Sequence, residues 1–574
     1  MTAHAPPAWL SRRPWGAEVS EGIGRADVWS VGTAVIALLA IVPTAAVIVL
    51  SFMPDENLWP HLVRTVLPHY IVTTLALMVG VGVGTFVIGV GTAWLVTMCR
   101  FPARRTLECA LLLPLAMPAY VVAYVYTDLL EYAGPVQSAL RAAFGWSSAA
   151  DYAFFEIRSL GGAIAVMTAV LYPYVYLLAR AAFLAQSVCA LEVSRTLGLT
   201  PMRSFTQVAV PLARPAIAIG LMLVLMEALN DYGTVQFFAV PTFTLGIFDT
   251  WRVMNNLAGA AQLASVLLLF VLALIVLERR ARRQQRYHHT TGKYQPLPGF
   301  GLAGGRAVLA VLGCAVPVVL GFAIPAAVLA QLAFAHLGNT DIARYTALVG
   351  NSLGLSSSAA VIAVAVGTFM AYGVRLNGGK AVRALSRIAC LGYAVPGAVL
   401  AIGVLIPTAW LDNQVDAAMR AGFGFSTGLL LTGSVVALTI AYVVRFLALS
   451  LGTAEAGLAK ITRNMEGAAR TLGLGPLATL RRVHLPIMRS SVLTAAILVF
   501  VDGMKELPMT VILQPFDFQT LATFVYQYAS DERLGQAALP ALTIVAVGIL
   551  PVLLLSRAVG RARPGAIEQG ATAL

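Results

Sequence analysis

Residues 195–214 of this chain read RTLGLTPMRSFTQVAVPLAR, and residues 470–489 read RTLGLGPLATLRRVHLPIMR. Nine of the twenty positions are identical at a constant offset of 275 residues. An internal repeat of this length indicates that the chain consists of two related halves. Each copy stands between two apolar runs, so the copies occupy equivalent places in their halves.

Each copy predicts two short helices joined by a fixed bend, over about 190–197 and 465–472 for the first helix of each pair. A glycine in the left-handed conformation ends that helix, and a proline opens the second helix at its first position. A further proline is expected to break the second helix just before the next span. In chain order these residues are Gly198, Pro201 and Pro211 in the first copy, and Gly473, Pro476 and Pro486 in the second. An amphipathic hairpin resting on lipid is the alternative, but two equivalent copies favour two docking sites for one kind of partner.

The composition places the chain in a membrane. Of its 574 residues, 59% are hydrophobic and 11% are charged, and the mean hydropathy is +0.81. Soluble domains average about 45–50% apolar and about 25% charged residues. The net charge of +13 could fit nucleic acid, but the charges form short clusters between apolar runs. We therefore expect membrane lipid as a partner, and no nucleic acid.

Twelve apolar runs are long enough to cross a bilayer, which takes about 20 residues. They lie near 28–52, 70–96, 107–130, 160–185, 213–239 and 258–277 in the first half, and near 306–334, 348–374, 386–411, 427–452, 491–513 and 537–556 in the second. Arginine and lysine follow every even-numbered run, which predicts that both termini are cytoplasmic. The fold class is therefore an all-α polytopic membrane protein with two six-helix repeats.

The same pattern divides the chain into five segments. They are a cytoplasmic tail (1–27), a first repeat (28–277), a basic cytoplasmic linker (278–305), a second repeat (306–556) and a second cytoplasmic tail (557–574).

Four charged residues lie within or near apolar spans: Asp231, Asp502, Lys505 and Glu506. Each costs about 2.5–3.5 kcal/mol at mid-bilayer on insertion scales, so such residues usually face a cavity or a partner. Asp502 and Lys505 are spaced to pair on one helix face, with Glu506 on the same side. The group has two readings, a pathway or gate, or an ion-paired strut that locks span eleven to a neighbour.

Two helix interruptions accompany these charges. Pro508 is expected to interrupt span eleven, and Gly233, next to Tyr232, to loosen span five at the corresponding place. Broken membrane helices are tolerated where they line a cavity, so we expect these two helices to flank the path. The hydroxyls of Tyr120 and its neighbours in span three are further candidates there, with packing as the alternative.

The repeated loop resembles the EAA loop of ABC importer permeases, in which a glycine precedes a proline by thirteen residues. The first copy has Glu192, Arg195 and Gly198 in that frame. The second copy has Gly467 where the family has glutamate, with Glu466 one residue earlier and Arg470 after it. The resemblance implies a MetI-like type I ABC importer permease fold whose loops dock into grooves on ATP-binding subunits.

The resemblance also implies the partners. Two copies of an ABC ATP-binding subunit and a periplasmic or lipid-anchored substrate-binding protein are expected, at the bacterial inner membrane. The same resemblance implies a transport subunit rather than an enzyme, with no cofactor bound by this chain and with ATP and Mg²⁺ on the partner subunits. Accordingly, its nearest phosphate-loop look-alike, Gly378-Gly379-Lys380, is followed by Ala381 where serine or threonine would hold magnesium.

Two motifs narrow the substrate. Asp231-Tyr232-Gly233 and Lys505-Glu506-Leu507-Pro508 are similar to motifs of the fused permeases of ferric-iron ABC importers. Fe³⁺ is a hard cation that prefers oxygen ligands, although no metal-ligand set is assigned. Thiamine, polyamine and phosphonate permeases share the architecture and remain alternatives within the class.

Two other classes of protein fit less well. An ion-coupled secondary transporter with inverted repeats is disfavoured, because six spans per half keep both repeats in one orientation. A membrane enzyme lacks the expected paired nucleophile and base.

Overall fold

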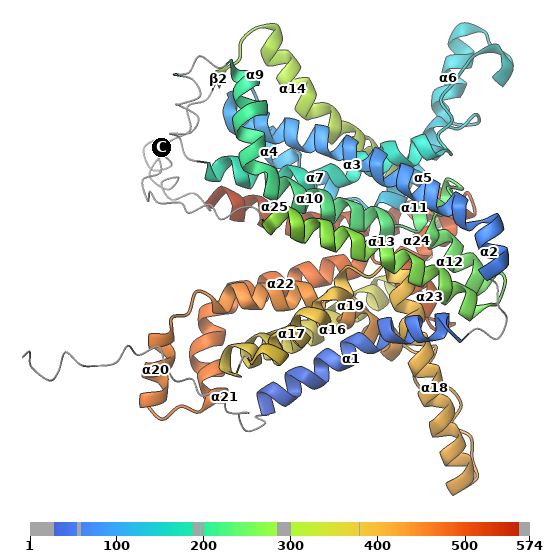
Figure 1. The fold of residues 1–574 in the computed structure, drawn as a ribbon. Helices are drawn as coiled ribbons and strands as arrows, with labels where there is room; N and C mark the ends of the chain where they lie inside the picture. Colours follow the sequence, from blue (N-terminus) through green and yellow to red (C-terminus); the bar gives the residue numbers. More distant parts are fainter. Residues whose placement is uncertain are drawn as a thin grey trace, which may run out of the picture.

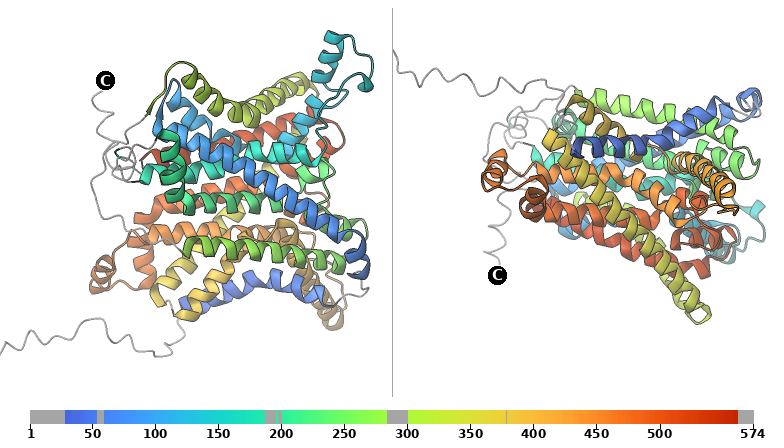
Figure 2. Two further views of the ribbon diagram at one scale, coloured as in Figure 1. Left: turned by 45° about the horizontal axis from the view of Figure 1, so that its top comes forward. Right: turned by 90° about the horizontal axis from the view of Figure 1, so that it is seen from below.

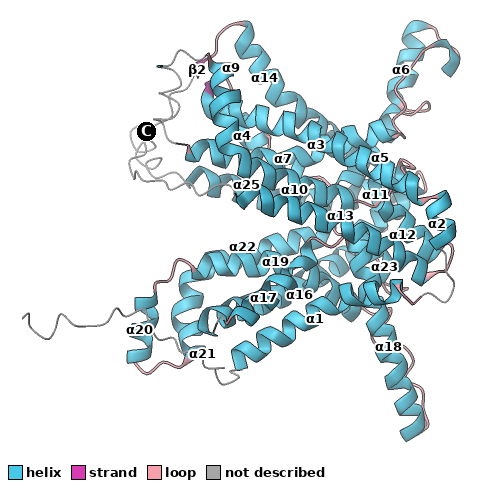
Figure 3. Cartoon of the chain, viewed as in Figure 1, coloured by secondary structure: helices cyan, strands magenta, loops and turns pink. Residues whose placement is uncertain are grey.

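The computed structural model describes residues 28–53, 59–186, 196, 200–283, 300–377 and 379–561. These residues are almost entirely helical, and β1 (Cys99–Arg100) pairs in parallel with β2 (Phe300–Gly301) (Figure 3). The helices before residue 284 are α1 (Val28–Ser51), α2 (Trp59–Thr65), α3 (Leu67–Met98), α4 (Arg104–Ala110), η1 (Leu113–Ala116), α5 (Ala119–Leu130), α6 (Pro135–Phe144), η2 (Ala149–Asp151), α7 (Leu160–Ala185), α9 (Pro201–Ser204), η3 (Phe205–Ala209), α10 (Val210–Asn230), α11 (Gly233–Phe237), α12 (Phe243–Arg252) and α13 (Leu257–Arg283).

The second half repeats this order. Its helices are α14 (Gly305–Val318), η4 (Val319–Ala323), α15 (Ile324–His336), η5 (Leu337–Asn339), α16 (Ile342–Asn377), α17 (Lys380–Ala389), η6 (Cys390–Tyr393), α18 (Gly397–Phe423), α19 (Val435–Leu458), α20 (Arg463–Thr471), α21 (Pro476–Thr479), η7 (Leu480–His484), α22 (Leu485–Lys505), α23 (Pro508–Leu513), α24 (Leu521–Ser530) and α25 (Leu534–Arg561).

Within the described ranges, eleven helices are long and apolar enough to cross a membrane, and one bent pair makes up to twelve. The bent pair is 104–116 followed by 119–144, with an angle of 93° between its parts. It stands where the third span was predicted near 107–130, and that span is a bent pair of helices rather than a single helix. Pro114 and Pro118 lie at this bend, and proline removes a backbone donor and disfavours a continuous helix.

Several other span boundaries also differ from prediction. The ninth and tenth spans are α18 and α19, which begin later than the predicted 386 and 427. The fifth and eleventh spans end at Asn230 and Lys505, earlier than the predicted 239 and 513. A polar residue directly follows each of these two helix ends. The apolar run from which the span was predicted therefore extends beyond the end of the long helix.

The outer faces of the helices fit a lipid surround. In α1, Leu38, Leu39 and Val49 are exposed, while Ala37 and Ala40 are buried against neighbouring helices. Small buried residues allow close approach of helices in a bilayer, where apolar side chains lose nothing by facing lipid.

The two halves exchange their first helices. α1 packs against α16, α17 and α18 of the second half, whereas α14 and α15 pack against α3, α4 and α5 of the first. α1 and α14 accordingly lie at opposite edges of the bundle (Figure 2). A Cβ built on Gly403 of α18 would lie 2.3 Å from the Pro43 carbonyl oxygen of α1, so glycine allows this close crossing. The hydrophobic core therefore forms two clusters, each with helices from both halves.

The repeated loops lie at one end of the molecule. α9 of the first loop and α20 and α21 of the second are at the same end in Figure 1, and α22 and α25 diverge toward that end. At the opposite end, α11, α12, α23 and α24 lie close together. The short helices α11 and α23 start just after the long helices α10 and α22 stop, and this is where the charged residues gather.

Candidate functional site

The second repeated loop has the predicted bend. Gly473 has φ +78°, and the amides of Gly473 and Leu474 donate to the carbonyls of Arg470 and Ala469 at 3.0 and 3.1 Å. This is a Schellman motif, which satisfies the last carbonyls of α20. Pro476 is the first residue of α21, as expected for a proline at a helix start.

The first loop is described only in part. Glu192, Arg195 and Gly198 lie outside the described residues, whereas Pro201 is the first residue of α9. The predicted bend at Gly198 therefore stays a prediction.

The prediction that Pro211 and Pro486 break the second helix is wrong. Each proline is the second residue of a long helix, and the helix runs through it, as in the continuous helix Pro476–Lys505. A π-helical turn precedes each proline, η3 in the first copy and η7 in the second, at positions related by the same offset of 275. Such a turn shifts the hydrogen-bond pattern by one residue, and this absorbs the missing donor of the proline.

Glu466 ties α20 to the membrane helices of its own half. Its carboxylate accepts from Arg375 Nε of α16 at 2.5 Å and lies 3.3 Å from His484 Nε2. The Arg375 guanidinium also donates to the carbonyls of Leu458 and Ile461. The Tyr372 hydroxyl donates to the Pro476 carbonyl at 2.8 Å. The second loop is therefore fastened to α16 and α19, whereas the Arg470 side chain is exposed.

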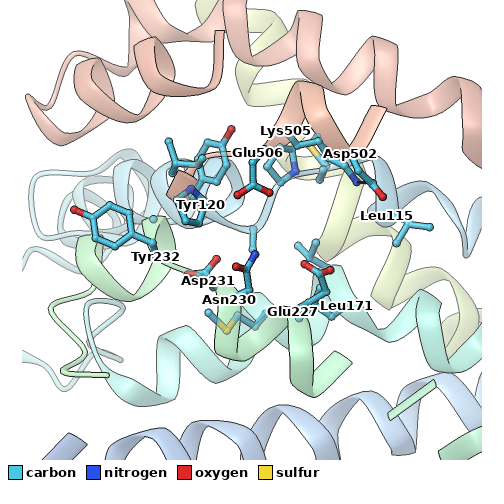
Figure 4. Close-up of a pocket in the computed structure, with 18 of the residues that line it drawn as sticks. Leu115, Tyr120, Leu171, Glu227, Asn230, Asp231, Tyr232, Asp502, Lys505 and Glu506 are labelled. Atoms are coloured by element: carbon cyan, nitrogen blue, oxygen red, sulfur yellow. Dashed lines mark ion pairs between the residues drawn. The ribbon is translucent and has the colours of Figure 1, made fainter. Parts of the chain in front are cut away.

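All seven predicted pathway residues line one cavity of about 120 Å³, which lies where the halves meet (Figure 4). They are Asp231, Tyr232, Gly233, Asp502, Lys505, Glu506 and Pro508. The predicted interruption of span eleven is present, because α22 ends at Lys505 and Pro508 opens α23. Gly233 likewise opens α11 after α10 ends.

The predicted ion pair is present, but the expected place of Glu506 is wrong. Lys505 Nζ lies 3.2 Å from Asp502 Oδ1. Glu506 instead follows the end of α22 in extended conformation, which turns its side chain away from Asp502. Its Oε2 lies 3.3 Å from Arg445 Nε of α19, and both side chains are nearly fully buried.

Arg445 and Asn230 join the two halves beside this pair. The Asn230 Oδ1 atom of the first half accepts from Arg445 Nη1 at 3.1 Å and from the Gly397 amide at 2.5 Å, both in the second half. These contacts close one side of the cavity.

A layer of hydroxyls crosses the halves farther toward α24. Tyr232 Oη and Tyr526 Oη are 3.2 Å apart, and the Tyr526 hydroxyl also donates to Gln236 Oε1. Burial raises the pKa of the Tyr526 phenol. At the edge of this layer, Arg158 pairs with Glu131 of its own half and with Glu532 of the other.

On its other side the cavity leads toward the end that carries the repeated loops. A second cavity of about 380 Å³ shares Tyr174, Tyr393, Asp502 and Lys505 with the first. It continues past Leu498, which precedes Asp502 in α22 and so lies nearer the loop end. The two cavities thus share lining residues, and the second extends toward the repeated loops.

Sequence reasoning missed Glu227, Asn230 and Arg445, which line the same cavity. Glu227 and Asn230 stand 275 residues before Asp502 and Lys505, so extending the repeat into span five would have found them. Arg445 is the lone charge in the apolar stretch ALTIAYVVRFLALSLG, which was itself a signal.

Comparison with known proteins gives a consistent result. The family model for the binding-protein-dependent transport system inner membrane component matches residues 85–285 and 363–563. A Haemophilus influenzae Fe(3+)-transport system permease protein is 26% identical over 490 residues, which are 84% of this chain and 88% of that protein. A ferric transport system permease protein of Actinobacillus pleuropneumoniae is 23% identical over 557 residues, 91% of this chain and 76% of that protein. A putative 2-aminoethylphosphonate permease of Salmonella paratyphi A is 26% identical over 207 residues, 36% of this chain and 72% of that protein.

Proposed function

Because the chain belongs to the family of binding-protein-dependent transport system inner membrane components, we propose that it forms the pathway of an ATP-driven importer for ferric iron. The two family matches fall one in each half, 278 residues apart, which is close to the repeat's offset of 275, so one chain supplies both membrane halves. The ferric-transport relatives align across both halves, whereas the phosphonate relative aligns over 36% of the chain. The oxygen-rich lining of the cavity supports the same substrate, because Fe³⁺ prefers oxygen ligands.

The observation that carries the transport mechanism is one continuous helix. It runs from Pro476 in the second loop to Lys505 at the cavity. Since Glu466 and Arg375 fasten the loop to α16, a push on the loop moves the cavity wall as well. Alternating access then consists of opening the side closed by Arg445, Asn230 and Tyr526 while the loop ends approach each other.

The partners follow from this arrangement. Two ATP-binding subunits dock on the two loops, one on each, through Glu192, Arg195, Gly198, Pro201 and Pro211 in the first and Glu466, Arg470, Gly473, Pro476 and Pro486 in the second. ATP and Mg²⁺ reside on those subunits. A periplasmic or lipid-anchored binding protein delivers the substrate at the opposite end, and both termini lie in the cytoplasm of a bacterium.

The double variant Gly198→Asp and Gly473→Asp tests the docking. At Gly473 an aspartate adds a side chain and a negative charge to the bend, where φ is positive. We expect the ATP-binding subunit no longer to co-purify, while membrane insertion stays normal. Undiminished co-purification would remove the docking assignment.

Substrate identity needs a separate measurement. The permease, reconstituted with its ATP-binding subunit and binding protein, is offered ferric iron, thiamine, a polyamine and a phosphonate in turn. Stimulated ATP hydrolysis is expected with ferric iron. If one of the other solutes stimulates ATP hydrolysis and ferric iron does not, that solute is the substrate and ferric iron is not.

A further inference from the structure

The repeat continues into the cavity and pairs its acidic residues. At the offset of 275, Glu227 corresponds to Asp502 and Asp231 corresponds to Glu506. All four line the same cavity, two from each half. Figure 4 shows Glu227 and Asp231 extending from one side of this space toward Glu506 on the other.

Three of the four carboxylates have partners. Asp502 pairs with Lys505 and Glu506 with Arg445. Asp231 accepts from the Thr234 amide at 2.9 Å, the Val235 amide at 3.2 Å and the Thr234 hydroxyl at 2.9 Å, which caps the start of α11.

Glu227 is the exception. Within the part of the chain that the structure describes, no hydrogen bond and no ion pair within 4.0 Å engages its carboxylate.

The imbalance arises because both neutralising cations belong to the second half. At the positions equivalent to Lys505 and Arg445, the first half has Asn230 and Val170. Four carboxylates and two cations leave excess negative charge in the cavity, and Glu227 is the carboxylate without a partner within 4.0 Å among the described residues. An unpaired charge in a membrane interior is costly and usually marks a pathway.

A second oxygen without a partner lines the same cavity. The Tyr120 side chain is 5% exposed, and its hydroxyl has no hydrogen-bond partner among the described residues. Buried hydroxyls are almost always satisfied by protein or water, and no described protein group fills this position at the Tyr120 hydroxyl. A carboxylate and a phenol oxygen are the donors that a hard cation prefers.

We propose that Glu227 receives the hard cation during transit, with the Tyr120 hydroxyl as a further oxygen donor elsewhere on the wall of the same cavity, and that this role rests on the proposed import of ferric iron. Lys505 and Arg445 are paired with the carboxylates of Asp502 and Glu506 in the second half. The ion is therefore bound by the first half only, and it dissociates readily.

Binding is tested with Tb³⁺, a hard trivalent cation whose emission is sensitised by nearby tyrosine. Purified permease in lipid nanodiscs is titrated with Tb³⁺ alone, as wild type, Glu227→Gln and Glu227→Asp. Glu455→Gln, a carboxylate of α19 that does not line the cavity, is the matched control. We expect Glu227→Gln to weaken sensitised Tb³⁺ binding about tenfold or more, as for the loss of one charge-assisted ligand. Glu227→Asp should retain part of the binding, and the control should match wild type.

Transport supplies the second readout. With binding protein and ATP-binding subunit, Glu227→Gln should lower ferric uptake about tenfold while binding-protein-stimulated ATP hydrolysis persists. Unchanged Tb³⁺ binding and unchanged uptake in Glu227→Gln would overturn the role of Glu227. If wild type itself moves no ferric iron, the proposed substrate is wrong, and the Tb³⁺ comparison still decides whether Glu227 binds a hard cation.

Discussion

Replacing Glu506 with glutamine should destabilise the protein strongly, because it leaves the Arg445 guanidinium buried without an anionic partner. The side chains of Arg445 and Glu506 are only 5% and 6% exposed. Breaking a buried pair of this kind by removing one charge costs about 3–5 kcal/mol. The loss reflects the unpaired charge that remains more than the attraction that is removed.

Asp502→Asn provides a matched control on the same helix. Its pair with Lys505 keeps 32% and 20% of the side-chain exposure, and pairs near solvent contribute about 0–1 kcal/mol. The double variant Arg445→Gln and Glu506→Gln removes both charges, so it should be more stable than Glu506→Gln alone.

The assay is unfolding by SDS titration in mixed micelles, with the free energy of unfolding compared among the four proteins. The expected order from most to least stable is wild type, Asp502→Asn, the double variant and Glu506→Gln. If Glu506→Gln is no less stable than Asp502→Asn, the pair does not lock span eleven to α19 and the reading as a strut fails.

Three further predictions concern other contacts. Gly473→Ala should weaken the second loop by about 1 kcal/mol, because φ is positive there, while Gly473→Asn should cost less since asparagine tolerates this conformation; equal losses of ATP-binding-subunit affinity would contradict this. Arg375→Gln removes the contacts of Arg375 with Glu466 and with the carbonyls of Leu458 and Ile461, so it should reduce the amount of substrate transported per ATP hydrolysed. An unchanged ratio would show that the contacts of Arg375 with the second loop are not needed for coupling. Gly403→Val should displace α1, because even a Cβ there meets the Pro43 carbonyl oxygen at 2.3 Å; unchanged disulfide formation between cysteines introduced at the α1–α18 contact would show that the crossing tolerates the added volume.

The elements governed by local rules were predictable from the sequence. Apolar run length gave the spans, and the glycine and proline positions gave the bend at Gly473, because a left-handed turn and a proline helix start depend on neighbouring residues alone. The prediction failed at Pro486, since a π-helical turn absorbs the missing hydrogen bond that was expected to end the helix.

The exchange of first helices was not predictable in this way. Hydropathy says that α1 and α14 face lipid on one side, but not which half covers the other side. That choice depends on close contacts between distant residues, such as Gly403 with Pro43.

The site was predictable in its members but not in its pairings. All seven predicted residues line the cavity, yet helical spacing placed Glu506 beside Asp502. That rule holds only while the helix continues, and α22 ends at Lys505. The partner Arg445 lies 61 positions earlier in the chain, where no local rule connects it to Glu506.

Accumulation of radioactive iron in proteoliposomes tests the central claim most directly. The permease is reconstituted with its ATP-binding subunit and binding protein, and ferric iron is supplied on the side of the binding protein. We predict that iron accumulates inside only when ATP is present on the side of the repeated loops. It should fail to accumulate in the variant with Gly198→Asp and Gly473→Asp. Accumulation without ATP, or none with all components present, would contradict an ATP-driven ferric importer.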